Sequence, residues 1–322
     1  MYIKRISVIL TISFISSCSC IERDIGTETN PVIIEVLTSA PISSVIGNIE
    51  NLAKFIEKES GLKTSVYAPK KNIEYIQALS SSKRKADVAI LNDVGYLFAK
   101  DEYGATAELI TLRYSSKNET ATSYCSAIIS VSLKSLEELN GKKIAFSSEY
   151  STAGYLIPLY NLKEKGISCS EKLFAGSYTD ALRMLLSGRV DAAAIYTSCD
   201  STSNELDSRS LLLKEYPDIF TRTVVIFKSP PIPNEPVVFR KGIKKERKEK
   251  IISALMRCPE DSICRDSLIS INRVVGFKRV RGNEYDNLRQ IIKSLEKDTA
   301  DLIQGGWILR IGNTVELPRS GN

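Results

Sequence analysis

The sequence contains no histidine, and this absence removes several classes of chemistry. It excludes Ser-His-Asp and Cys-His catalysis, zinc sites of the H-E-x-x-H type and every histidine-ligated metal. The G-x-x-x-x-G-K-[ST] run of P-loop nucleotide enzymes and the G-x-S-x-G motif of hydrolases are also missing. What remains is an enzyme that uses carboxylates or hydroxyls, or a protein that binds without chemistry.

The charge balance is too weak to indicate a nucleic-acid partner. Lysine and arginine number 44 against 38 aspartates and glutamates, which gives a formal net charge of +6 spread along the chain. Nucleic-acid binding requires a clustered basic surface. The 322 residues are enough for about two domains, and 43% of them are apolar, so a substantial buried core is expected.

The N-terminus has the pattern of an export signal. A short basic segment, Met1–Arg5, precedes an apolar stretch over Ile6–Ile15 that is too short to span a bilayer. The residues that follow, ending in Ser16-Ser17-Cys18, resemble the lipobox of bacterial lipoproteins. The alternative is an ordinary secretory signal cut near Ser19. We predict a lipoprotein signal peptide over 1–17, lipidation of Cys18, and a polar, flexible tether over 18–31.

The other cysteines leave their pairing open. Cys258 and Cys264 are six residues apart and can close a small disulfide loop outside the cytoplasm, or they are two free thiols. Cys125, Cys169 and Cys199 form an odd remainder. Because these cysteines have neither histidine partners nor C-x-x-C spacing, we expect no metal site.

The rest of the chain alternates between strand-like and helix-like segments. Short apolar or alternating runs indicate strands, and apolar residues on one helical face indicate helices. The order β-α-β-α-β predicts an α/β fold with a mainly parallel sheet and helices on both faces, and the pattern then repeats. The expected strands are 32–37, 62–67, 87–91, 126–132, 144–146 and 191–196; the expected helices are 49–60 (ending at Gly61), 73–79, a start over 94–100, 133–139, 154–165, 179–186 and 284–304.

Two passages repeat the same unit about 105 positions apart, roughly the size of one lobe. Each is a helix, a polar turn and a strand that begins with aspartate and continues with small apolar residues, Asp87–Leu91 and Asp191–Ile195. The repeat indicates two similarly built lobes, although any α/β protein repeats this unit. Ligands of open α/β sheets bind beyond the carboxyl ends of the strands. The residues expected at one cleft are therefore Asn92 and Asp93 after the first strand, and Tyr196 and Thr197 after the second.

The most specific segment is Gly141–Pro158, which reads as a strand, a hydroxyl-rich turn and the start of a helix. Ser151 or Thr152 can cap that helix. The free N–H groups of its first turn, its dipole and two hydroxyls together can bind an anion without any basic side chain. The alternative is plain capping, because serine and threonine cap helices everywhere.

This segment resembles the corresponding block of the phosphonate-binding protein family, the substrate-binding proteins of phosphate, phosphite and phosphonate ABC importers. The resemblance implies a type II periplasmic-binding-protein fold, in which two α/β lobes close on a ligand and two strands cross between them, near Tyr124 and Pro233. It implies that lobe 1 consists of 32–123 and 234–322, and lobe 2 of 124–233. The passages that match in order are Ala86–Leu91, Gly141–Pro158, Gly176–Tyr178 with Gly188–Ala194, Ser229–Pro236 and Tyr285–Arg289.

The resemblance also implies a set of site residues. In the loop Ser151–Gly154, Ser151 and Thr152 bind the oxyanion through their hydroxyls, and Ala153 binds it through its backbone N–H only, because it replaces a family serine. Several further positions depart from the family pattern, and the loss of the acidic partner at Tyr196 argues against an aminoalkylphosphonate. Tyr178 stands where a histidine is common, Tyr196 where an acidic residue often meets the ligand, Asn72 where a tyrosine is usual, and Asn92 where a glycine follows the strand.

Asp93 has two interpretations: it caps a helix, or it accepts a hydrogen bond from a protonated phosphate and so rejects sulfate. The function we expect is binding without catalysis, with no cofactor, by a monomeric lipoprotein outside the cytoplasm. Its expected partners are a small phosphorus oxyanion, ABC permease subunits and, through the lipid, a membrane. The alternatives are an enzyme on the same scaffold, with Glu149, Asp93 or Tyr178 as catalyst, and a sensor or adhesion lipoprotein.

Overall fold

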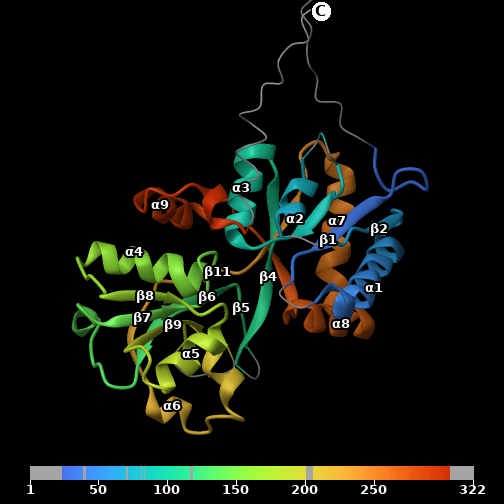
Figure 1. The fold of residues 1–322 in the computed structure, drawn as a ribbon. Helices are drawn as coiled ribbons and strands as arrows, with labels where there is room; N and C mark the ends of the chain where they lie inside the picture. Colours follow the sequence, from blue (N-terminus) through green and yellow to red (C-terminus); the bar gives the residue numbers. More distant parts are fainter. Residues whose placement is uncertain are drawn as a thin grey trace, which may run out of the picture.

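The structure is a computed structural model that describes residues 24–38, 41–69, 72–80, 82, 84–116, 119–200 and 206–304. Within these ranges the chain forms two lobes, each built on its own β-sheet, which lie side by side in Figure 1. The predicted signal peptide, Cys18 and most of the predicted tether lie outside the described residues. In the part of the chain that is described, no helix is both long enough and apolar enough to cross a bilayer.

The sheet of the first lobe has the order β13-β4-β12-β3-β1-β2, with β5 paired to β4. Strands β2 and β3 run parallel to the central β1, as predicted, whereas β12 and β13 run antiparallel to their neighbours. Its strands are β1 (Val32–Val36), β2 (Thr64–Val66), β3 (Val88–Ile90), β4 (Thr106–Ser116), β5 (Glu119–Ala121), β12 (Pro236–Phe239) and β13 (Gly276–Arg279). Its helices are α1 (Ile42–Ser60), α2 (Asn72–Ala78), α3 (Asp93–Tyr103), α7 (Lys245–Arg257), α8 (Ser262–Asn272) and α9 (Asp286–Ser294).

The sheet of the second lobe has the order β10-β6-β9-β7-β8, with β11 paired to β6. Strands β8 and β9 are parallel to β7, and β6 is antiparallel to both β9 and β10. Its strands are β6 (Ser123–Ser130), β7 (Lys143–Phe146), β8 (Glu171–Phe174), β9 (Ala192–Thr197), β10 (Val224–Lys228) and β11 (Ile232–Pro233). Its helices are α4 (Ile157–Glu164), α5 (Tyr178–Leu186) and α6 (Ile219–Arg222), and the single turns are η1 (Glu137–Leu139), η2 (Thr152–Leu156) and η3 (Ser208–Leu212).

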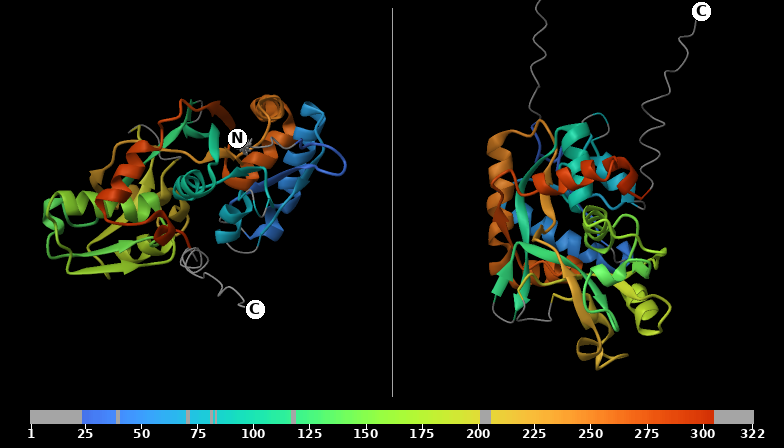
Figure 2. Two further views of the ribbon diagram at one scale, coloured as in Figure 1. Left: turned by 90° about the horizontal axis from the view of Figure 1, so that it is seen from above. Right: turned by 90° about the vertical axis from the view of Figure 1, so that its left-hand side faces the viewer.

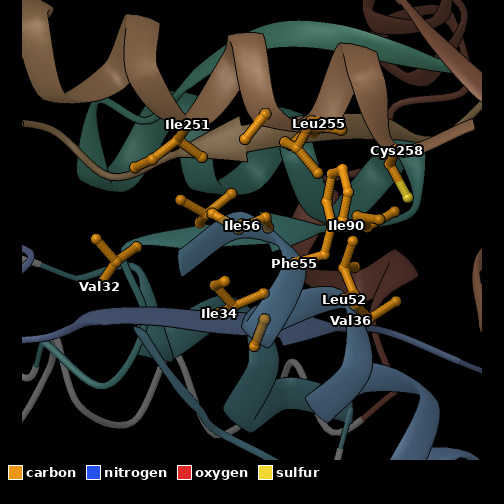
Figure 3. Close-up of a cluster of buried hydrophobic side chains, with 14 of the residues drawn as sticks. Val32, Ile34, Val36, Leu52, Phe55, Ile56, Ile90, Ile251, Leu255 and Cys258 are labelled. Atoms are coloured by element: carbon orange, nitrogen blue, oxygen red, sulfur yellow. The ribbon is translucent and has the colours of Figure 1, made fainter. Parts of the chain in front are cut away.

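The core of the first lobe lies between β1 and the helices α1 and α7 (Figure 3). Alternate residues of a strand point to the same face of a sheet, so Val32, Ile34 and Val36 all join this core. The predicted C-cap of α1 is confirmed, because Gly61 has a φ of 68°, a conformation that favours glycine. Helix α1 begins at Ile42, earlier than predicted. Its apolar stripe packs against α7 and α8 as well as the sheet.

Three predictions fail for identifiable reasons. The predicted tether ends too late, because Ile25 is fully buried in the core of the first lobe. The predicted helix over 133–139 is only the turn η1, because the chain becomes extended at Asn140, where ψ is 126°. The predicted helix over 284–304 breaks after α9, where Glu296 has a φ of 55° and Asp298 caps the separate turn η5 (Thr299–Leu302).

Two stretches of chain connect the lobes. The first runs from β4 and β5 into β6, and the second runs from β11 into β12. The fully buried side chain of Asn234 joins them, because its amide donates to the backbone oxygens of Thr111 (3.0 Å) and Ala121 (2.9 Å). The Tyr285 hydroxyl donates to the Asn234 carbonyl oxygen (2.7 Å), so the segment before α9 is anchored at the same crossing.

The C-terminal segment contacts both lobes. Leu288 and Ile292 of α9 share an apolar cluster with residues of α3 and with Leu156 and Ile157 of the second lobe. The Lys163 ammonium of α4 donates to the backbone oxygen of Ser294 (2.9 Å). Figures 1 and 2 show α9 beside α4. The C-terminal segment, which the sequence analysis assigned to the first lobe, thus contacts the second lobe as well.

Candidate functional site

The hydroxyl-rich turn after β7 forms the start of a helical segment made of η2 and α4. Ser151 is its N-cap, and the Ser151 hydroxyl accepts a hydrogen bond from the Gly154 N–H (2.9 Å). The first turn, η2, is one turn of π-helix, a feature that is frequent at functional sites. The sequence favours this geometry because Ser151 caps the segment and Gly154 leaves room, while Pro158, seven residues after the cap, supplies no backbone N–H inside the segment.

Gly154 is required by close packing at this turn. A Cβ at Gly154 would lie 1.9 Å from the Ser147 hydroxyl oxygen and 2.8 Å from that of Ser151. Ala153 is fully buried, and its carbonyl oxygen accepts from the Ser126 hydroxyl of β6 (2.7 Å). Ser147 and Ser126 were not predicted as site residues. The one sequence feature that could have indicated Ser147 as a site residue is its position directly after a predicted strand.

Thr152 reaches across the lobe boundary. Its hydroxyl donates to Oδ1 of Asp93 in the first lobe at 2.7 Å. The two side chains are 6% and 5% exposed, so the hydrogen bond is shielded from water. The same Asp93 oxygen accepts from the Val94 N–H (2.8 Å). The structure therefore brings together Asp93 and Thr152, which the sequence predicted from separate passages.

The other predicted residues of the first lobe lie differently. Asn92 is exposed and is the N-cap of α3, since its side-chain oxygen accepts from the Gly95 N–H (2.8 Å). Helix capping thus falls to Asn92, whereas Asp93 is the first helical residue. Asn72 is the first residue of α2, and its assignment to the site stays a prediction.

Three tyrosines surround the turn from the second lobe. The Tyr178 hydroxyl shares a 2.7 Å hydrogen bond with the Ser151 hydroxyl. The Tyr178 and Tyr196 rings meet edge to face, with centroids 4.9 Å apart. Burial raises the pKa of Tyr178 to about 12, so this phenol is a neutral donor at physiological pH. Tyr124 at the start of β6, which sequence reasoning did not assign to the site, has a pKa raised by burial and by the nearby Asp93 and Tyr178.

The charged groups near Asp93 are few. Burial raises the pKa of the Asp93 carboxyl to about 6, and the repulsion of Glu235 acts in the same direction. Glu235 lies at the second crossing, where its carboxylate pairs with the Arg113 guanidinium at 2.7 Å. The sequence showed neither Glu235 nor Arg113 as a site residue, because their role depends on how the crossings meet.

The described residues contain two disulfides, and one of them was not foreseen. Cys258 and Cys264 are bonded at the junction of α7 and α8, as one of the two open alternatives had it. Cys125 of β6 is bonded to Cys199, which follows β9, across 74 residues of sequence. Cys169 is a free thiol. Among the described residues, no group of three or more Cys, Asp or Glu side chains could hold a metal ion.

The arrangement gathers hydrogen-bond donors at the junction of two lobes. The donors are hydroxyls of Ser151, Thr152 and Tyr178 together with the start of the η2–α4 segment. Glu149, one of the residues considered for catalysis, is exposed on the turn. Two α/β lobes with crossing strands and donors between them define a binding protein of the type II periplasmic fold.

The family model for the periplasmic substrate-binding proteins of phosphonate ABC transporters matches residues 37–285. The chain belongs to this family, whose members act outside the cytoplasm. This agrees with the resemblance seen in the sequence.

Individual relatives are distant. The phosphonates-binding periplasmic protein of Escherichia coli is 28% identical over 165 residues, which are 43% of this chain and 46% of that protein. The chain thus matches about half the length of this relative.

The solved structures show the fold alone, since their identities are low. A phosphonate-transporter binding protein of Pseudomonas aeruginosa has a TM-score of 0.58 at 18% identity, over 81% of this chain and 85% of that one. A Prochlorococcus marinus protein in complex with methylphosphonate has a TM-score of 0.59 at 16% identity, over 83% and 98%. A Xanthomonas citri protein bound to chloride has a TM-score of 0.63 at 15% identity, over 88% and 99%.

Proposed function

We propose that this protein captures a phosphorus oxyanion (phosphate, phosphite or a phosphonate without an amino group) between its lobes and delivers it to an ABC permease. The observation that carries the proposal is the hydrogen bond between Thr152 and Asp93. It brings the start of η2–α4 in one lobe against the other lobe, where a bound anion would be enclosed.

The chemistry of the donors supports an oxyanion. Ser151, Thr152 and Tyr178 supply neutral hydroxyls, and the helix start adds N–H groups and the positive end of a dipole. Losing one donor of a buried polar contact costs about 1–3 kcal/mol, or roughly 5- to 150-fold in affinity. No step of bond breaking is required. The lobes would close on the ligand, and the permease would recognise the closed form.

Thermal unfolding with a ligand panel tests the proposal. The panel is phosphate, phosphite, methylphosphonate, 2-aminoethylphosphonate, sulfate and small carboxylates. A ligand at about 100 times its dissociation constant adds ~2.7 kcal/mol, which raises the melting temperature visibly. We expect one phosphorus oxyanion to do so, and the double variant Ser151→Ala, Thr152→Val to lose the response. The control Ser130→Ala removes a buried hydroxyl at the far end of β6 and should keep it.

A flat response across the panel from folded wild-type protein would contradict the proposal. So would a response that survives the double variant. In either case the ligand would have to be sought outside phosphorus compounds.

We also propose that Cys18 carries lipid and anchors the protein to a membrane. A single acyl chain binds only marginally, so stable anchoring requires several chains. Mass spectrometry of the mature N-terminus tests this: Cys18 should bear the added mass of the acyl groups, and Cys18→Ser should release the protein from the membrane fraction. An unmodified N-terminus near Ser19 would indicate an ordinary secretory signal.

A further inference from the structure

The hydrogen bond between Thr152 and Asp93 has a consequence for how a ligand enters. The Thr152 hydroxyl is a donor that the proposed function assigns to a ligand oxygen, and here it donates to a carboxylate of the chain itself. A carboxylate oxygen and a phosphonate oxygen accept hydrogen bonds in the same way. Asp93 therefore occupies, with respect to Thr152, the position of the ligand's oxyanion.

The second oxygen of Asp93 is unusual. Oδ2 is buried and has no hydrogen-bond partner among the described residues. Buried polar atoms are paired in most native structures, and a buried carboxylate is stable only with partners. Oδ1 has two donors, the Thr152 hydroxyl and the Val94 N–H. Asp93 is thus held as an acceptor on one side only, which leaves Oδ2 open to a proton.

Within the part of the chain that the structure describes, the groups that face Asp93 include no cationic partner. They are the Thr152 hydroxyl, the Glu235 carboxylate at the second crossing, and three phenols, Tyr124 of β6, Tyr178 of α5 and Tyr285 before α9. Glu235 is paired with Arg113. Burial raises the pKa values of all three phenols above their ordinary value, so they stay neutral in the range where Asp93 titrates.

We propose that Asp93 is an intramolecular competitor for the oxyanion site, and that a ligand binds when Asp93 is protonated or displaced from Thr152. The proposal rests on the proposed function and adds a regulation to the same site. Ionised Asp93 takes the Thr152 hydroxyl and repels an incoming anion. Protonated Asp93 no longer repels it and can itself donate a hydrogen bond to the ligand. Oxyanion capture is therefore accompanied by proton uptake and strengthens as pH falls.

The pKa of Asp93, about 6, sets the size of the effect. At about pH 8 such a group is ionised roughly 100 to 1, and at about pH 5.5 it is mostly protonated. If only the protonated form accepts ligand, the affinity of the wild type falls about 100-fold across this range. Asp93→Asn imitates the protonated form in shape and charge, so this variant should bind with nearly constant strength.

The experiment compares methylphosphonate affinity in wild type and Asp93→Asn by calorimetry between about pH 5.5 and pH 8. Taking the ratio of the two dissociation constants removes the ligand's own titration, because both proteins meet the same ligand. We expect the ratio of wild type to variant to rise from near one to about 100. Titrations in buffers of different ionisation enthalpy should show proton uptake of up to one proton per ligand in wild type, and less in the variant. The control Asp191→Asn removes a carboxylate that accepts from the Lys143 N–H, and it should behave as wild type.

Two outcomes overturn the proposal. If Asp93→Asn binds more weakly than wild type at every pH, Asp93 is a ligand contact that accepts a proton-bearing oxygen. If the ratio does not change with pH, the carboxylate does not compete. A melting curve of each variant establishes that it is folded before either result is read.

A separate measurement distinguishes failure of the proposal from failure of the proposed function. If no phosphorus oxyanion binds to any variant at any pH, the proposed function fails. The contact of Asp93 with Thr152 can then be tested by itself, by small-angle X-ray scattering of the protein without added ligand. Asp93→Ala should raise the radius of gyration as the lobes part, because the hydrogen bond between Thr152 and Asp93 is lost. An unchanged radius overturns the role of Asp93 in holding Thr152.

Discussion

The two disulfides should differ in how much they stabilise the protein, and the difference can be calculated from the chain. The Cys125–Cys199 bond closes a segment with a sequence separation of 74, and the Cys258–Cys264 bond closes one of 6. A crosslink stabilises mainly by reducing the freedom of the unfolded chain, and the effect grows with the logarithm of loop length.

The loop-length relation gives about 4 kcal/mol for the long loop and about 2 kcal/mol for the short one. The double variant Cys125→Ala, Cys199→Ala should therefore lose about twice as much stability as Cys258→Ala, Cys264→Ala. Each variant also exchanges buried sulfur for smaller methyl groups, a change that is common to both. The comparison between the two variants cancels most of this shared effect.

Equilibrium unfolding in urea measures the two losses. The free energy in water follows from linear extrapolation, and an unchanged slope shows that the compactness of the unfolded state is comparable. Wild type treated with a reductant under mild denaturation supplies an internal check, because it loses both crosslinks without any substitution.

Equal losses, or a larger loss for the short loop, would refute the calculation from loop length.

Ligand affinity provides a second measurement, which separates effects on binding from effects on stability. Cys125 lies between Tyr124 and Ser126, and Cys199 lies just beyond the end of β9, so removal of this bond should also weaken ligand binding. Removal of the Cys258–Cys264 bond, at the junction of α7 and α8, should leave affinity unchanged.

Three further predictions concern buried groups. Burial raises the pKa of Glu35, both of whose oxygens lack a partner among the described residues, so the folded protein retains a proton that the unfolded chain releases. Stability should fall as pH rises above about 4.5 by up to ~1.4 kcal/mol per pH unit, and Glu35→Gln should remove this slope in pH-dependent urea titrations. Gly154→Ala should abolish oxyanion binding, because the added methyl group clashes with the Ser147 side chain. A second substitution, Ser147→Gly, should restore part of the affinity; if it restores none, the clash with Ser147 is not the reason why glycine is required. Asn234→Ala should cost roughly 2–4 kcal/mol in urea unfolding, since it removes two hydrogen bonds, one buried and one partly buried, and a loss below about 1 kcal/mol would exclude its role at the crossing.

Elements with local signals were predictable from the sequence. The strand over 32–37 and the turn after 144–146 carry their hydrophobic pattern and capping residues within a few positions. Gly61 ends α1 because a left-handed residue is required there. The antiparallel strands β4, β12 and β13 were not among the predicted strands, and their pairing is set by contacts between segments far apart in the sequence.

The sequence named some residues of the candidate site, and it could not predict the contacts between them. Ser151, Thr152 and Tyr178 were expected from one loop and one helix start, and Ser151 does contact Tyr178. The bond between Cys125 and Cys199 depends on the register that aligns Cys125 with Thr197, which no spacing rule shows. The contact between Asp93 and Thr152 depends on how the two lobes meet, so the residues next to each of them in the sequence do not indicate it.

An apolar cluster runs from the first lobe through α9 to Leu156 and Ile157, and it should make the heat capacity depend on whether the lobes are open or closed. Parting the lobes exposes this apolar surface to water, and exposure of apolar surface raises the heat capacity. Opening should therefore carry a positive heat-capacity change, and ligand binding that closes the lobes a negative one. Because apolar association weakens on cooling, the open form should become more populated in the cold.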